Sequence, residues 1–133
     1  MASRDIKDLH HILSDAYVKA EAQFKLQYPN SPQPFRTCTF RSNEEQEHLY
    51  AQTPKVTNAR AGQSPHNYLP SLAFDIAFIN SAKQLDWSNL LFKNFADIIC
   101  KIEPNIEWGG SWKGFSDAPH YELKNWRNYI KVA

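Results

Sequence analysis

The segment that most restricts the fold is the apolar run "LAFDIAFI", residues 72–79, which carries a carboxylate, Asp75, in its middle. A run this rich in Phe and Ile predicts a strand, and the side chains of a strand alternate between its two faces. Phe74 and Ile76 therefore share one face, and Asp75 lies on the other between two alanines. Because a buried carboxylate is costly unless it is paired, hydrogen-bonded or bound to a metal, this strand predicts polar partners for Asp75.

The chain offers two histidines as such partners. His120 lies in a second strand-like segment, "HYEL", in which it shares a face with Glu122. His66 stands in a loop before the first strand, and each histidine directly follows a proline that stiffens its approach. Glycines cluster in the loops that lead to both histidines, as expected for loops shaped around a site.

Two histidines and a carboxylate are a suitable set of ligands for a catalytic zinc ion. Three protein ligands leave a fourth position for water, and the metal lowers the pKa of that water to about 7. A further carboxylate must accept the proton, and Asp117, shortly before His120, is the nearest candidate. From the residue types alone, hydrogen-bonded structural histidines and a turn-forming aspartate remain the alternative.

The remaining pattern indicates an α+β fold in a single domain, residues 1–133, with a short, mostly antiparallel sheet and flanking helices. Helical spacing of apolar residues predicts an amphipathic helix from Ile6 to Phe24 with Asp5 as its N-cap. "FRTCTFRS" (35–42) predicts a strand, "NEEQEHLYAQ" (43–52) a short helix, residues 53–63 a loop, and "NIEWGG" a further β segment. A second amphipathic helix is predicted for residues 86–102, with these side chains facing the core: Trp87, Leu91, Phe95, Ile98 and Ile102.

Composition excludes several classes of protein. With 15 basic and 14 acidic residues and a net charge of +1, the chain lacks the basic surface expected of a nucleic-acid-binding protein. No apolar run approaches the roughly 20 residues of a membrane span, and the amino terminus lacks the apolar segment of a secretory signal. We therefore expect a protein made in a cytoplasm, in which Cys38 and Cys100 are reduced residues in apolar surroundings.

The segments "SPHNYLPSLAFDI" and "WGGSWKGFSDAPHYEL" resemble the zinc D,D- and L,D-peptidases of peptidoglycan. That family includes D-Ala-D-Ala carboxypeptidases, vancomycin-resistance dipeptidases and phage L-alanyl-D-glutamate endolysins, and the resemblance extends over about residues 35–123. It implies that Zn²⁺ is held by His66, Asp75 and His120 and that Asp117 is the general base. "FRSNEEQEHLY" resembles the family segment that carries an arginine near the scissile carbonyl, which here is Arg41.

The sequence departs from the family pattern between the first two proposed ligands. Eight residues separate His66 from Asp75, more than the family usually has, and Leu69, Pro70 and Ser71 replace a glycine. This insertion alters the loop beside the metal, whereas the ligands flank it. We therefore expect the ligand set to be kept.

Further residues have candidate roles beside these ligands. Ser64 is expected to orient a ligand or bind substrate, or to be a plain turn residue, and Glu122 to support the site from behind a ligand or to replace Asp117 as base. Tyr68 and Trp112 are expected to form aromatic walls of the substrate groove, and the alternative for Trp112 is packing in the core. The alternative for Arg41 is a surface residue that caps the acidic helix. A carboxypeptidase would need a cation for the terminal carboxylate, for which the candidates are Arg60 and Lys55.

The resemblance implies a phage endolysin that hydrolyses the peptidoglycan stem peptide, and we expect the L-Ala–D-Glu bond to be cut. Such an enzyme acts as a monomer on peptidoglycan, without nucleic acid or membrane insertion. It accumulates in the host cytoplasm and reaches the wall in the periplasm once the inner membrane is opened. The alternatives are a D-Ala-D-Ala carboxypeptidase or dipeptidase with the same metal site, and a non-catalytic zinc-binding domain, in which Asp117 would have no purpose.

Overall fold

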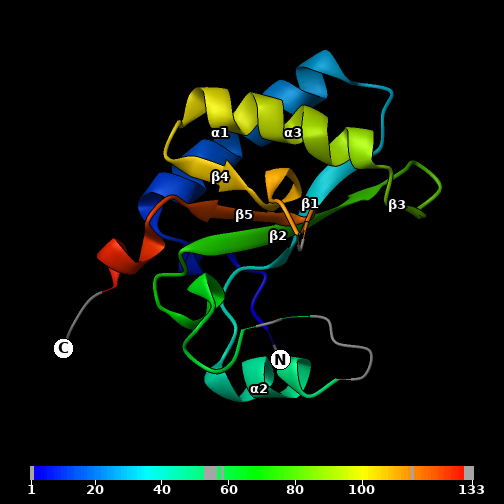
Figure 1. Cartoon of the computed structure of the whole chain (residues 1–133). Coiled ribbons are helices and arrows are strands. Elements are labelled where there is room, and N and C mark those ends of the chain that lie inside the picture. Colours follow the sequence, from blue (N-terminus) through cyan, green and yellow to red (C-terminus); the bar gives the residue numbers. More distant parts are fainter. Residues whose placement is uncertain (1, 53–56, 58, 115, 131–133) are drawn as a thin grey trace.

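The computed structural model describes residues 2–52, 57, 59–114 and 116–130, and this part of the chain forms a five-stranded sheet with helices on both sides (Figure 1). The strand order is β1-β2-β5-β4, with β3 also paired to β2, and every pair is antiparallel. The expected α+β class is confirmed. The strands are β1 (Gln33–Cys38), β2 (Ala73–Ile79), β3 (Leu85–Asp86), β4 (Ile106–Trp108) and β5 (His120–Leu123).

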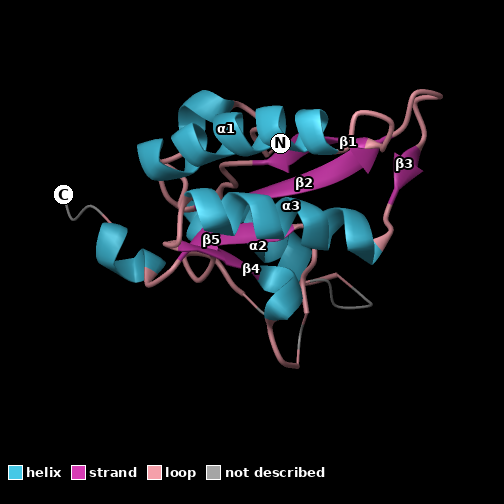
Figure 2. Cartoon of the chain, turned by 90° about the horizontal axis from the view of Figure 1, so that it is seen from above, coloured by secondary structure: helices cyan, strands magenta, loops and turns pink. Residues whose placement is uncertain are grey.

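Two long helices, α1 (His11–Gln27) and α3 (Asn89–Ile102), lie side by side over one face of the sheet (Figures 1 and 2). The short helix α2 (Asn43–Tyr50) lies on the opposite side, among loops. Between the sheet and the two long helices is a core of buried apolar side chains, among them Tyr17, Phe24, Phe74, Phe78, Phe92, Phe95 and Tyr121. No helix in the described part of the chain has the length and hydropathy needed to cross a membrane.

The first helix differs from the prediction at both ends. Asp5 does cap a helical turn, but this is a short 3-10 turn, Ile6–Asp8, that ends before α1 begins. His10 then caps α1, since its Nδ1 accepts a hydrogen bond from the backbone N–H of Ile12 at 3.2 Å. The periodic apolar residues continue across both pieces, so periodicity alone did not reveal the break.

The second long helix begins three residues later than predicted. Asp86 belongs to β3, which forms a short hairpin with the end of β2 and was not expected from the sequence. Trp87 is therefore outside the helix and 57% exposed, and Ile102 at the far end is 37% exposed. Leu91 and Phe95 are buried as predicted, together with residues on the same face of α3: Phe92, Ala96 and Ile99.

The alternation predicted for β2 is confirmed. Phe74 and Ile76 are fully buried in the core, whereas Asp75 faces away from it. The predicted strand over 35–42 is displaced, because β1 ends at Cys38 and the following residues are held by the polar groups described below. Of the predicted loop over 53–63, residues 53–56 and 58 lie outside the described residues.

Candidate metal centre and active site

Sheet register brings the chemistry together around Asp75. This residue pairs with His120 of β5 on one edge of β2 and with Cys38 of β1 on the other. Residues directly opposite each other in an antiparallel ladder project on the same face, so all three side chains lie together away from the core. A register shift between Arg36 and Cys38 indicates a bulge that turns β1 at this point.

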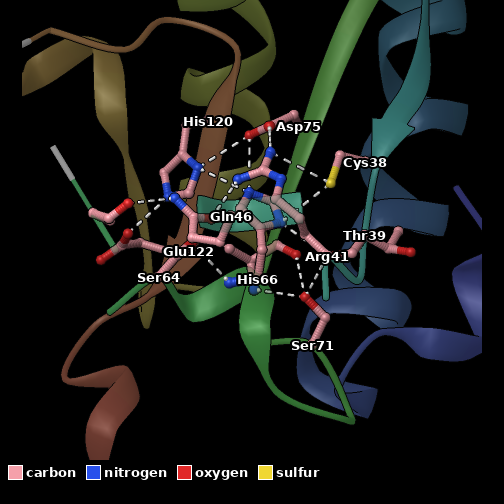
Figure 3. Close-up of polar contacts among 12 residues, drawn as sticks. Cys38, Thr39, Arg41, Gln46, Ser64, His66, Ser71, Asp75, His120 and Glu122 are labelled. Atoms are coloured by element: carbon pink, nitrogen blue, oxygen red, sulfur yellow. Dashed lines mark hydrogen bonds and ion pairs between the residues drawn. The ribbon is translucent and has the colours of Figure 1, made fainter. Parts of the chain in front are cut away.

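His66 completes a compact triangle of donor atoms with Asp75 and His120 (Figure 3). Its Nε2 lies 3.2 Å from Asp75 Oδ1 and 3.3 Å from His120 Nδ1, and the Asp75 oxygen lies 3.0 Å from that Nδ1. Both histidines are buried, and the Asp75 side chain is 22% exposed.

The triangle fits a tetrahedral metal ion. Ligands at the roughly 2.0–2.1 Å typical of zinc–nitrogen and zinc–oxygen bonds lie about 3.3 Å from one another in a tetrahedron. The three observed separations match this spacing, and two imidazoles with a carboxylate are a set that zinc accepts. The residues present therefore fit the expected ion, with His66 offering Nε2 and His120 offering Nδ1.

The other nitrogen of His66 is held by backbone. Nδ1 donates to the carbonyl oxygen of Thr39 at 2.8 Å, which directs Nε2 into the triangle. His66 itself lies in a short 3-10 turn, Pro65–Asn67, whose N-terminus is capped by Ser64: the Ser64 hydroxyl accepts from the His66 N–H at 3.2 Å. Ser64 thus caps the turn that carries His66, and its role toward a metal or a substrate stays a prediction.

The other nitrogen of His120 is held by a carboxylate. Glu122 accepts from Nε2 through Oε1 at 2.7 Å, and this side chain is almost fully buried on the same face of β5. A carboxylate behind a metal-binding histidine fixes the tautomer and raises the basicity of the ligand. The position suits Glu122 to support His120, and the assignment of the general base to Asp117 stays a prediction.

Cys38 was expected in apolar surroundings and instead lies at the edge of this site. Its sulfur is 3.7 Å from His66 Nδ1, and Cys38, His66 and Asp75 also form a group whose potential ligand atoms lie within 4.8 Å of one another. The sulfur contacts Nδ1 of His66, which donates to the Thr39 carbonyl, whereas Nε2 faces Asp75 and His120. The geometry therefore favours His120 over Cys38 as the third ligand.

Arg41 and Gln46 form a polar pair beside the triangle (Figure 3). Arg41 reaches Asp75 Oδ2 at 3.6 Å, while its Nη1 donates to Gln46 Oε1 at 3.0 Å. Gln46, on α2, is fully buried and donates in turn to the Ala59 carbonyl at 2.7 Å. No role was predicted for Gln46, because its partner Ala59 lies in a separate loop and no local pattern indicates this contact.

Asp117 lines a cavity of about 770 Å³ together with the triangle and Arg41. Its backbone N–H donates to the Gly109 carbonyl at 2.9 Å, and its own carbonyl accepts from the His120 N–H at 3.1 Å. A Cβ at position 109 would collide with the Asp117 carbonyl, so glycine is needed for this close approach. Burial raises the pKa of Asp117 above its ordinary range, as suits a group that must exchange protons.

The inserted loop between the ligands is accommodated outside the triangle. Leu69 is 59% exposed, whereas Ser71 is buried. The Ser71 hydroxyl lies 2.6 Å from the Thr39 carbonyl oxygen and 2.8 Å from the Ala73 carbonyl oxygen, and it can donate to either. The chain is thus fixed again immediately before β2. His66 and Asp75 reach the same place despite the longer connection.

Of the other residues with expected roles, one lines the cavity and two do not, and one lies outside the described residues. Trp112 lines the cavity, and its indole N–H donates to Glu107 at 3.1 Å. Tyr68 does not belong to the described lining: its ring packs on Trp126 and its hydroxyl donates to the Gly62 carbonyl. Arg60 forms an exposed ion pair with Glu47 at 3.2 Å, and Lys55 lies outside the described residues.

The site residues lie in the part of the sequence that matches a known family. The sequence model of a family of M15 peptidases, described as D-alanyl-D-alanine carboxypeptidase, matches residues 57–123, which hold all three corners of the triangle and Asp117. The chain belongs to this M15 peptidase family. The part of the chain that matches is half of its length and contains β2, α3, β4 and β5.

Two relatives refine the comparison. The peptidoglycan L-alanyl-D-glutamate endopeptidase CwlK of Bacillus subtilis is 40% identical over 96 residues, which cover 63% of this chain and 56% of that protein. The chain thus spans little more than half the length of this curated relative. The crystal structure of the Serratia marcescens L-Ala D-Glu endopeptidase ChiX has the same fold, with a TM-score of 0.66 and 22% identity over 98% of this chain and 93% of that one.

Without a metal, the two histidines and Asp75 shift one another's pKa values. Burial opposes the charged form of His66, but the adjacent Asp75 carboxylate outweighs it and raises the pKa of the imidazole to about 10. For His120, burial is likewise outweighed by hydrogen bonds to Asp75 and Glu122, and the pKa rises to about 9. Burial would raise the pKa of Asp75, yet the two imidazoles hold it well below its ordinary range.

The ligand set predicts different outcomes for two neighbouring substitutions. His120→Ala should abolish stoichiometric zinc binding, because it removes one of three ligands. Cys38→Ala should retain one zinc per chain, since the sulfur lies outside the triangle. Metal analysis after dialysis against zinc-free buffer measures both, with circular dichroism as the control for folding. Equal loss of zinc in the two variants would contradict the assignment.

Zinc affinity is predicted to rise with pH. In the metal-free protein the raised pKa values keep imidazole protonated at neutral pH, so zinc must displace protons to bind. Between pH 6 and 8 the dissociation constant should fall about tenfold per pH unit for each proton displaced. Competition with a chelating dye at several pH values measures this slope. A dissociation constant that does not change with pH would show that neither histidine is a ligand.

Proposed function

We propose that this protein is a zinc endopeptidase that hydrolyses the L-Ala–D-Glu bond of the peptidoglycan stem peptide. The observation that carries the proposal is the triangle of His66, Asp75 and His120 in one cavity with Asp117, in a chain of the M15 family. The bond is proposed by analogy with CwlK and ChiX, whose names state it.

His66, Asp75 and His120 would hold the zinc ion, which when bound supplies Lewis-acid activation of water and of the scissile carbonyl. Asp117 accepts the proton of the attacking water at its carboxylate and returns it to the nitrogen of the leaving amine. Arg41 offers guanidinium N–H donors toward negative charge that develops on the carbonyl oxygen. Gln46 holds Arg41 in place for that role.

Two observations favour this activity over its alternatives. The names of both relatives state the L-Ala–D-Glu bond, and Arg60, the cation expected for a terminal carboxylate, is paired with Glu47 and is not among the described lining residues. A non-catalytic zinc domain needs no base, yet the half-buried Asp117 lines the same cavity as the triangle.

The role of the protein in its host remains a prediction from the sequence. A phage endolysin would accumulate in the host cytoplasm and reach peptidoglycan in the periplasm after the inner membrane is permeabilised. The relatives named above are from bacteria. Lysis of cells that express the protein only when the inner membrane is opened would support the phage role.

The products of digestion test the proposed bond. Mass spectrometry of digested peptidoglycan should reveal glycan chains that bear only L-Ala and peptides with a new D-Glu amino terminus. Asp117→Asn should bind zinc as the wild type does but form these products roughly 100-fold more slowly or worse, because it cannot accept a proton. Asp97→Asn, an exposed carboxylate on α3, is the matched control and should remain fully active.

Release of free D-Ala without these peptides would establish the carboxypeptidase alternative. Near wild-type activity of Asp117→Asn would move the base to Glu122. No cleavage of either bond by the zinc-loaded protein would favour the non-catalytic domain.

A further inference from the structure

The cavity extends in both directions from Asp75, and its two ends differ chemically. Because β5 runs antiparallel to β2, the residues that follow β5 lie beyond the first residues of β2. β3 instead pairs with the last residues of β2, so Trp87, directly after β3, lies at the other end. Figure 1 shows the C-terminal turn and β3 at opposite ends of β2. Trp126 and Arg127 line the cavity at the first end, and Trp87 at the second.

The first end presents a positioned cation. Arg127 is exposed, and its guanidinium lies 4.2 Å from the centroid of the Trp126 ring. Trp126 is itself buried to 7% exposure and packs against Tyr68, so it is a fixed platform. Within the described part of the chain no carboxylate pairs with Arg127. The Arg127 guanidinium is held over the indole and can form a bidentate ion pair with a carboxylate of the substrate.

The other cation in the cavity wall is already engaged. Arg41 donates to Gln46 and lies 3.6 Å from Asp75, so its charge is directed at the centre of the site. Arg127 is therefore the cation among the described lining residues that remains for a charged group of the substrate at one side of the centre.

The second end presents an uncharged aromatic surface. Trp87 is 57% exposed and its ring stacks on Phe92 of α3 with an interplanar angle of 13°. One face of the indole thus rests on the buried Phe92, and the exposed Trp87 ring is not part of the core. An exposed, supported indole is suited to pack against the C–H face of a sugar ring.

The two sides of the proposed scissile bond differ in the same way as the two ends of the cavity, with a charge on one side and an uncharged group on the other. On the amino side of the L-Ala–D-Glu bond the stem is attached to an uncharged sugar of the glycan. On the carboxyl side, D-Glu continues the stem through its side-chain carboxyl and leaves its α-carboxylate free. We propose that the stem binds with its D-Glu carboxylate at Arg127 and its glycan sugar at Trp87, an orientation that rests on the proposed function.

Three matched substrates test this orientation: a disaccharide stem peptide, the same peptide with the D-Glu α-carboxylate amidated, and the same peptide without the disaccharide. The zinc-loaded wild type should prefer the free carboxylate over the amide by about tenfold in kcat/KM. Arg127→Gln should lose that preference, and Arg127→Lys should keep most of it. Trp87→Ala should lower kcat/KM about tenfold for the disaccharide peptide and leave the sugar-free peptide unchanged.

Two exposed neighbours outside the cavity lining are the controls. Lys124→Gln removes a positive charge near Arg127, and Leu90→Ala removes an apolar surface near Trp87; both should behave as the wild type. If the L-Ala–D-Glu bond is cut but Arg127→Gln keeps the preference for the carboxylate, or Trp87→Ala affects both peptides equally, the orientation is wrong. If the wild type cuts only a D-Ala–D-Ala bond, the proposed function itself fails, and the orientation with it.

Discussion

The rest of the site depends on one carboxylate shared by two buried imidazoles. Asp75 Oδ1 lies 3.2 Å from His66 Nε2 and 3.0 Å from His120 Nδ1. A carboxylate on a central strand must have such partners, because its desolvation would otherwise be prohibitive. The partners come from a loop and from the neighbouring strand, so the proposed metal centre depends on how the sheet and the loop are held together.

A layer of fixed polar groups maintains this cluster. The Thr39 carbonyl and Glu122 each hold the second nitrogen of a histidine, which leaves the first nitrogen free to face Asp75. Gln46 holds Arg41, and the close approach at Gly109 holds the loop that carries Asp117. The proposed mechanism requires groups held this firmly, because a displacement of about 1 Å can cost 100-fold in rate.

The sequence predicts the parts of this structure that follow from strict periodicity. Alternation in β2 and β5 assigned Asp75, His120 and Glu122 to one face and the core-facing residues to the other. The register of such strands is strongly specified, because a slip by one residue would exchange the buried face and the polar face. His66 was a candidate from its residue type and its loop, and the family resemblance then supported it as a ligand. These predictions agree with the described geometry.

Features that depend on tertiary contact were not predictable from the same patterns. The backbone at the break before α1 is bonded to the distant Ser71, and the exposure of Trp87 depends on a two-residue strand too short to show alternation. Cys38 was expected in apolar surroundings, whereas pairing across the sheet puts it opposite Asp75. Gln46 gained its role from folding of a loop onto α2, which no local pattern encodes.

The central claim is that two imidazoles and one carboxylate, without the nearby thiol, form the metal centre. X-ray absorption at the zinc edge of the zinc-loaded protein tests it directly, since zinc–sulfur bonds are about 2.3 Å long and zinc–nitrogen or zinc–oxygen bonds about 2.0–2.1 Å. We predict a first shell of nitrogen and oxygen only, with the multiple-scattering signal of two imidazoles. A sulfur atom at about 2.3 Å, with the signal of a single imidazole, would contradict the account and place Cys38 in the site instead of His120.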